Sequence, residues 1–145
     1  MKNLQRLFSM AVLVCMAVAM FSCSKDDEEA VFAEADIMGT WTISSSDLKV
    51  NGVSDESISS WYVEGSILKI MEEKEYEVSK DDYIYERGSW SFDGKSTLTL
   101  TDSDDEATPF QIKSLNNEAA TLYSSVEESF LGVELKSEQT INLKK

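Results

Sequence analysis

The chain has 145 residues, which suits one domain, and its 27 acidic residues against 13 basic ones give a formal net charge of −14. Because nucleic-acid binding depends on Lys and Arg contacts to phosphates, we expect no nucleic-acid partner. The sequence has no histidine, which excludes Ser-His-Asp and Cys-His catalysis and His-ligated zinc, and we expect a protein that is not an enzyme.

Residues 1–22 have the pattern of a signal peptide. Lys2 and Arg6 make its start positive, and an apolar segment follows at residues 7–21. This segment is shorter than the roughly 20 residues of a membrane-spanning helix. It ends with Ser22 before Cys23, and this junction resembles the signal of bacterial lipoproteins. The resemblance implies that Cys23 is acylated, for example with palmitate, and becomes the first mature residue. A simple secretory signal and an uncleaved anchor are the alternatives.

Residues 23–35 are predicted to form an acidic tether. Lys25, Asp26 and Asp27 resemble the Lys-plus-acidic tag that sends lipoproteins of some Gram-negative lineages to the outward face of the outer membrane. The resemblance implies a protein that is held in the outer membrane by lipid on Cys23 and faces the cell exterior. The periplasmic leaflet is the alternative, since an acidic run alone is typical of any solvated tether.

From residue 36 to residue 145, short β-rich segments alternate with turn signals, which predicts one all-β domain. Leu98 and Leu100 alternate with threonines, as expected for a strand with one buried face. The step Asp93-Gly94 before them is typical of a tight hairpin. The strands that we expect are 39–46, 67–71, 76–79, 83–92, 97–101, 110–115, 120–125 and 140–143.

Two stretches fit more than one structure. Residues 57–63 could form a short strand or a turn of helix, and the apolar spacing of residues 126–133 also fits a helical turn packed on the barrel end. Pro109 is expected at a strand start, where a missing N–H is tolerated.

Pairing of each strand with its neighbour in sequence predicts an up-and-down antiparallel meander of about eight strands. Closing this sheet into a small β-barrel removes its two open edges. An open two-sheet sandwich is the competing architecture.

The triplet Gly39-Thr40-Trp41 resembles the start of lipocalins and of the lipocalin-like domains of bacterial surface lipoproteins. The segments 85–92, 98–100 and 110–112 follow in an order similar to that family. The resemblance implies a small lipocalin-like barrel with an open mouth. In the family the opening tryptophan closes the bottom of the barrel, so Trp41 is expected in the core rather than at a ligand.

A group of aromatic residues is the candidate ligand site, because aromatic side chains combine a large contact area with a polar tip. Ordinary core or cross-strand packing is the alternative for this group. The candidate ligand-binding residues are Trp61, Tyr62, Tyr76, Tyr83 and Tyr85.

The acidic run at residues 102–106 places oxygen ligands at alternate positions, as calcium sites do. It does not follow the EF-hand pattern, since Ala107 and Lys113 stand where that pattern needs glycine and glutamate. We therefore expect a solvated loop, no metal site and no cofactor.

These observations favour a non-enzymatic surface lipoprotein whose barrel binds a small apolar or amphipathic ligand in its mouth. The alternative is a non-catalytic interaction module with a filled barrel, which docks on protein partners in a cell-envelope complex. The interior distinguishes the two: an opening of roughly a few hundred Å³ favours the ligand binder, and a solid core favours the module.

Overall fold

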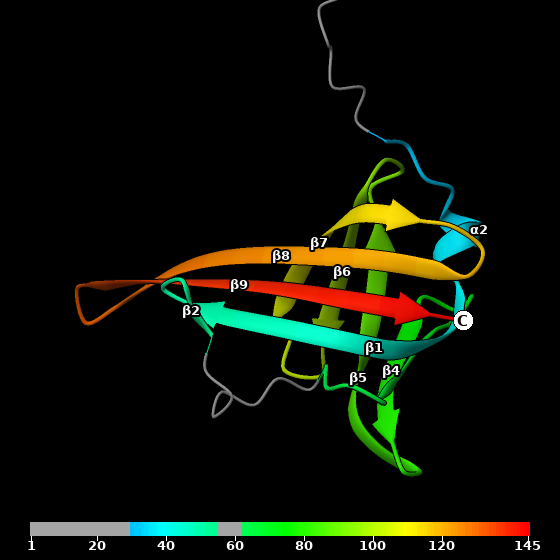
Figure 1. Ribbon diagram of the computed structural model, residues 1–145, viewed down its shortest axis with the longest axis horizontal. Helices are drawn as coiled ribbons and strands as arrows, with labels where there is room; N and C mark the ends of the chain where they lie inside the picture. The colour runs from blue at the N-terminus through cyan, green and yellow to red at the C-terminus, as the bar shows by residue number, and fades with distance from the viewer. Residues whose placement is uncertain (1–29, 55–61) are drawn as a thin grey trace, which may run out of the picture.

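The structure is a computed structural model, and it describes residues 30–54 and 62–145 (Figure 1). The predicted signal peptide, Cys23, the predicted tag at residues 25–27 and Trp61 lie outside the described residues. Across the part of the chain that is described, no helix is both long enough and apolar enough to cross a membrane.

The described ranges form one short helix and nine strands. All neighbouring strands are antiparallel, in the order β2-β1-β3-β4-β5-β6-β7-β8-β9, and β1 also pairs with β9. The pairing of β1 with β9 closes β1 and β3–β9 into a barrel of eight strands, with β2 added beside β1. The elements are α2 (Glu34–Ile37), β1 (Gly39–Val50), β2 (Val53–Ser54), β3 (Ile67–Ile70), β4 (Glu75–Lys80), β5 (Tyr83–Phe92), β6 (Thr97–Asp102), β7 (Ala107–Leu115), β8 (Ala119–Phe130) and β9 (Val133–Lys144).

This architecture confirms the predicted all-β fold and the up-and-down barrel, and it excludes the open sandwich. Each expected strand segment coincides with a strand of the barrel. The helical turn considered for residues 126–133 is not formed. Instead β8 continues to Phe130 and β9 begins at Val133, because Leu131 and Gly132 both adopt positive φ angles, 51° and 79°, and make a two-residue hairpin. Of residues 57–63, the described Tyr62 and Val63 lie in neither a strand nor a helix.

The closed half of the barrel is filled with apolar side chains. Trp41 is 1% exposed, so it lies in the core as expected, and it donates from Nε1 to the backbone oxygen of Ile37, 2.7 Å away. The helix α2, which the sequence does not predict, lies beside it at this end. The cavity left among Ile37, Trp41 and their neighbours measures about 10 Å³, which is the space of one water molecule. The other buried apolar side chains in the barrel include Ile43, Leu68, Ile70, Val78, Trp90, Leu98, Leu100, Phe110, Ile112, Leu122, Ile141 and Leu143.

The inward-facing side chains become polar in the other half of the barrel. A bulge between Ile43 and Ser45 shifts the register of β1 against β9, and Ser46 then pairs with Ile141 on the inner face. Further along, Gln139 lies opposite both Leu48 and Ser124. The barrel therefore has a solid apolar end and a polar open end.

Residues before position 36 also contact the barrel. The backbone N–H of Phe32 donates to the backbone oxygen of Lys95 at 2.8 Å, and the ring packs partly buried against the core. The side chains of Glu34 and Lys74 form an ion pair with an N–O distance of 2.5 Å. These contacts hold the chain that enters the barrel against its closed end.

Candidate functional site

The structure divides the predicted aromatic site into two pairs. Tyr62 and Tyr76 are buried inside the barrel, at 8% and 1% exposure. Tyr83 and Tyr85 are exposed near the start of β5, where their rings meet edge to face with centroids 5.1 Å apart. Trp61 lies outside the described residues. The five residues therefore do not line one common cavity within the described structure.

The buried pair is joined by Glu86, whose side chain points into the barrel because Glu86 lies opposite Val78 on the inner face. The hydroxyl groups of Tyr62 and Tyr76 both donate to Glu86 Oε1, at 3.0 Å and 2.5 Å. The ring of Tyr62 also packs edge to face on Phe110, at 5.7 Å between centroids. This arrangement ties residue 62, β4 and β5 together.

The two buried hydroxyl groups are held in their protonated form. Burial, followed by the charge of Glu86, raises the pKa of Tyr62 well above its usual value. Burial and the hydrogen bond to Glu86 likewise raise the pKa of Tyr76. Tyr62 and Tyr76 therefore act as neutral hydrogen-bond donors to the carboxylate of Glu86. These hydrogen bonds stabilise the barrel, and the two hydroxyl groups are not ionised to act as a base or a nucleophile.

A second feature, absent from the sequence predictions, lies where β7 and β8 separate. Their pairing runs from Leu115 and Ala120 only as far as Gln111 and Tyr123. Beyond this point β8 continues to Phe130 while pairing, within the described residues, only with β9. Figure 1 shows the resulting β8–β9 hairpin extending well beyond β7. We call this opening the β7–β8 seam.

A cleft of about 450 Å³ occupies the seam at the polar end of the barrel. Two carboxylates, those of Glu106 and Glu128, line it together with apolar side chains such as Val126. No Lys or Arg is among the lining residues that the structure describes. The lining residues are Leu48, Glu106, Ala107, Thr108, Ser124, Val126, Glu128, Ser137 and Gln139.

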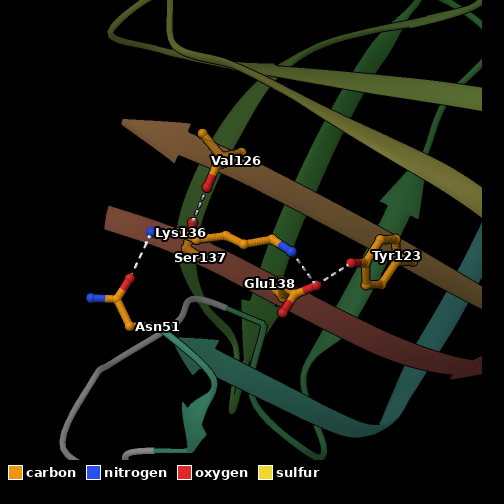
Figure 2. Close-up of polar contacts among 6 residues, drawn as sticks. All are labelled: Asn51, Tyr123, Val126, Lys136, Ser137 and Glu138. Atoms are coloured by element: carbon orange, nitrogen blue, oxygen red, sulfur yellow. Dashed lines mark hydrogen bonds and ion pairs between the residues drawn. The ribbon is translucent and has the colours of Figure 1, made fainter. Parts of the chain in front are cut away.

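Ser124 distinguishes this cleft from a solvated groove. The residue is 4% exposed, and its Oγ atom has no hydrogen-bond partner among the described residues. A buried hydroxyl without a partner costs about 1–3 kcal/mol, and a bound polar group would remove that cost. The nearby Ser137 hydroxyl, in contrast, donates to the backbone oxygen of Val126 at 3.5 Å (Figure 2).

The hairpin beside the cleft is braced on its outer face. The hydroxyl of Tyr123 donates to Glu138 Oε1 at 2.6 Å, and Lys136 Nζ lies 3.1 Å from the same oxygen (Figure 2). Hydrogen bonding to Tyr123 and then to Lys136 lowers the pKa of Glu138. Asn51, in the turn between β1 and β2, exchanges two hydrogen bonds with the backbone of Lys136, at 2.7 Å and 2.9 Å.

Another cleft, of about 510 Å³, lies beside β5 and includes Tyr85, Glu86 and Asp102 in its lining. Two of its carboxylates already have partners. Glu86 accepts from the two buried tyrosines, and Asp102 Oδ1 accepts the backbone N–H groups of Asp104 and Glu106 at 2.8 Å and 3.0 Å. This cleft therefore offers a ligand less than the seam does.

Neither a search for metal-binding side chains nor comparison with known proteins indicates another site. Within residues 30–54 and 62–145, no three His, Cys, Asp or Glu side chains gather closely enough to hold a metal ion. No protein-family model matches the chain, and a search of curated proteins finds no match. The β7–β8 cleft is the strongest candidate site on geometric grounds.

The cleft residues could have been suspected from a break in the hydrophobic pattern. In β8 the inward positions run Ala120, Leu122, Ser124 and Val126, so a serine interrupts an apolar face. In β9 the inward position before Ile141 is Gln139. Polar residues at positions that alternation assigns to the interior are the local signal of the polar mouth.

Proposed function

We propose that this protein is a lipid-anchored, surface-exposed lipoprotein whose lipocalin-like barrel binds a small amphipathic ligand at its mouth. One observation carries the proposal: the cleft of about 450 Å³ in the β7–β8 seam, with the unpartnered hydroxyl of Ser124 buried in its wall. Ligand pockets in proteins measure about 300–1,000 Å³ and have both apolar and polar lining groups. This cleft has such a volume and both kinds of group, although most of its lining residues are polar.

The structure favours an amphipathic ligand over a wholly apolar one. The apolar half of the barrel is solid, with a cavity of only about 10 Å³. The space at the open end is lined by Leu48 and Val126 on the one hand and by hydroxyl, amide and carboxylate groups on the other. A ligand with an apolar part and hydrogen-bonding groups would satisfy both kinds of lining.

The resemblance of the N-terminal sequence to bacterial lipoprotein signals supports attachment to the outer membrane through lipid on Cys23. The chain carries a formal net charge of −14, so anionic lipid head groups repel its body. An acyl anchor at the end of an acidic tether would hold the barrel away from the bilayer and leave its mouth open to solvent.

Native mass spectrometry of the full protein, purified from its host membranes, tests the proposed site. We expect a small-molecule adduct on the wild type that is lost in Ser124→Val. Ser91→Val is the matched control, because Ser91 is an exposed serine of β5 and is not among the residues that line the cleft. An adduct retained by Ser124→Val would contradict binding of that molecule in the seam, and no adduct on the wild type would contradict a small-molecule ligand.

The solid apolar half favours a second candidate, a non-catalytic interaction module with a filled barrel in a cell-envelope complex. Such a module would dock through loops and exposed strands. Cross-linking in intact cells distinguishes it from the first candidate: a captured protein partner that persists in Ser124→Val would support the module.

A further inference from the structure

The exposed edge of β8 restricts the ligand class of the seam, and the inference that follows rests on the function proposed above. Gln111 and Tyr123 are the last paired residues of β7 and β8. Phe130 and Val133 flank the two-residue turn at the tip of the hairpin, and such flanking pairs exchange their backbone hydrogen bonds. With the two-residue period of a strand, this directs the backbone groups of Phe130 toward β9.

The same period directs the N–H and C=O groups of the odd-numbered residues, Ser125, Glu127 and Ser129, toward the seam. Within the described residues these three residues have a partner strand on one side only, which is β9. Their backbone N–H and C=O groups point to the other side, toward the seam. They form a row of three donor and acceptor pairs on the seam edge of β8, and they alternate along the strand with Ser124, Val126 and Glu128, which line the cleft. An edge of this kind is a template for another extended chain.

β7 cannot satisfy this edge by itself. The backbone N–H of Ile112 donates to the oxygen of Ser96 on the β6 side, so the period of two places the nitrogen of Pro109 on the seam side. Proline has no N–H to donate. Pro109 is the residue of β7 that would continue the pairing with β8 beyond Gln111, and it cannot donate the backbone hydrogen bond that this pairing needs.

The charges around the cleft favour a positively charged ligand. Glu106 and Glu128 line it, and the described lining contains no basic side chain. The acidic pair does not stand alone, because the buried and unpartnered hydroxyl of Ser124 lies in the same wall. A second copy of this chain is a poor occupant, since two β8 edges in antiparallel register would bring Glu127 and Glu128 of both copies together.

The geometry points to an extended basic peptide segment of a partner protein, which adds as a strand to β8 in the seam. Its backbone pairs with Ser125, Glu127 and Ser129, and its inward-facing Lys or Arg side chain meets Glu106 and Glu128. A segment of about five to seven residues matches this length of edge. In this form the amphipathic ligand of the cleft is a short stretch of polypeptide.

Isothermal titration of the full detergent-solubilised protein with synthetic peptides tests this inference. The probe is a blocked heptapeptide of alternating lysine and valine. Its two controls are the same peptide with glutamate in place of lysine and the lysine peptide with N-methyl groups on alternate backbone nitrogens, which keeps the charge and removes strand pairing. We expect the lysine peptide to bind and each control to bind at least tenfold more weakly.

Variants of the protein locate the contact. The double variant Glu106→Gln, Glu128→Gln should bind the lysine peptide about tenfold more weakly than the wild type. Raised salt should weaken the binding of this peptide to the wild type. Glu118→Gln, an exposed position in the turn between β7 and β8, removes a charge away from the cleft and should have little effect. Slower hydrogen exchange at the amides of Ser125, Glu127 and Ser129 in the complex would support strand addition.

The outcomes separate the two proposals. Equal binding of the N-methylated peptide would overturn strand addition. No binding of the lysine peptide, while a small-molecule adduct is still lost in Ser124→Val, would overturn the peptide and retain the cleft as a binding site. Failure of both measurements would overturn the proposed function as well.

Discussion

The hydroxyl group of Tyr76 donates to Glu86 Oε1 at 2.5 Å inside the barrel. Tyr62 donates to the same oxygen at 3.0 Å, and burial together with Glu86 raises the pKa of both tyrosines. A tyrosine in the unfolded chain ionises near pH 10. The folded protein therefore retains two protons that the unfolded chain loses above that pH.

Stability should consequently fall as the pH rises above about 10. The unfolded state binds fewer protons than the native state there, so the free energy of unfolding decreases by about 1.4 kcal/mol per pH unit for each of the two tyrosines. Urea unfolding between about pH 8 and pH 11.5 measures the slope. Tyr76→Phe should remove one tyrosine's share of it, and Tyr83→Phe, at an exposed position, should not. Identical slopes in wild type and Tyr76→Phe would contradict the assignment.

A second prediction concerns Gly88, which lies opposite Asp102 in the pairing of β5 with β6. A Cβ atom at this position would lie 1.9 Å from the backbone oxygen of Thr101 and 2.8 Å from Cε1 of Tyr76. Backbone cannot move aside cheaply, so Gly88→Ala should lower the free energy of unfolding by about 3 kcal/mol or more. The neighbouring Ser89→Ala, at an exposed position, is the control. Free energies of unfolding that agree within about 0.5 kcal/mol between Gly88→Ala and Ser89→Ala, measured by urea titration, would show that β5 and β6 accommodate the Cβ atom without strain.

A third prediction concerns Ser66, which is fully buried and has an Oγ atom without a hydrogen-bond partner among the described residues. Removing this hydroxyl removes an unsatisfied group, so Ser66→Ala should raise the free energy of unfolding by about 1 kcal/mol. Ser44→Ala is the informative contrast, because Ser44 Oγ donates to the backbone oxygen of Asn142 at 3.0 Å. The midpoint temperature of thermal unfolding should rise for Ser66→Ala and fall for Ser44→Ala. A loss in both would mean that Ser66 has a partner.

The fold could be predicted where its signals are local. Leu98 and Leu100 are both buried, as their alternation with threonines requires. The hairpin at Asp93-Gly94 is formed, but its loop is longer than a two-residue turn. Asp93 Oδ1 accepts the backbone N–H groups of residues 95, 96 and 97, and these hydrogen bonds lower the pKa of that carboxyl to about 2. A side chain that satisfies three backbone donors stabilises the wider loop.

The polar inward positions Ser124 and Gln139 are a local signal of the mouth, but the position of the cleft could not be predicted, because it depends on where pairing between distant strands stops. No local feature of β8 says that Tyr123 is its last residue paired with β7. The bulge between Ile112 and Ser114 also changes which side chains of β7 face inward. At residues 126–133 the apolar spacing resembled a helical turn, and the decisive feature was the ability of Leu131-Gly132 to adopt positive φ. Such choices are made by register and not by composition.

The proposed export tag gives a fourth prediction. Replacement of Lys25, Asp26 and Asp27 together by alanine should leave lipidation intact and retain the protein on the periplasmic side. Protease added to intact cells should then digest the wild type and spare the variant. Replacement of Glu28 and Glu29 by alanine is the matched control, since it removes acidic charge just beyond the tag. Equal digestion of wild type and tag variant would place the export signal elsewhere.

The proposed anchoring through lipid on Cys23 gives the fifth prediction. Each buried methylene contributes about 0.8 kcal/mol, so two or three acyl chains hold a protein stably while one chain does not. The acidic body adds no attraction to anionic lipid, so Cys23→Ala should move the protein from the membrane fraction to the soluble fraction. Cys15→Ala changes the other cysteine of the chain, within the signal segment, and should leave the protein in the membrane fraction. Fractionation followed by intact-mass measurement reads both effects, and membrane attachment of Cys23→Ala would mean that another part of the chain binds the bilayer.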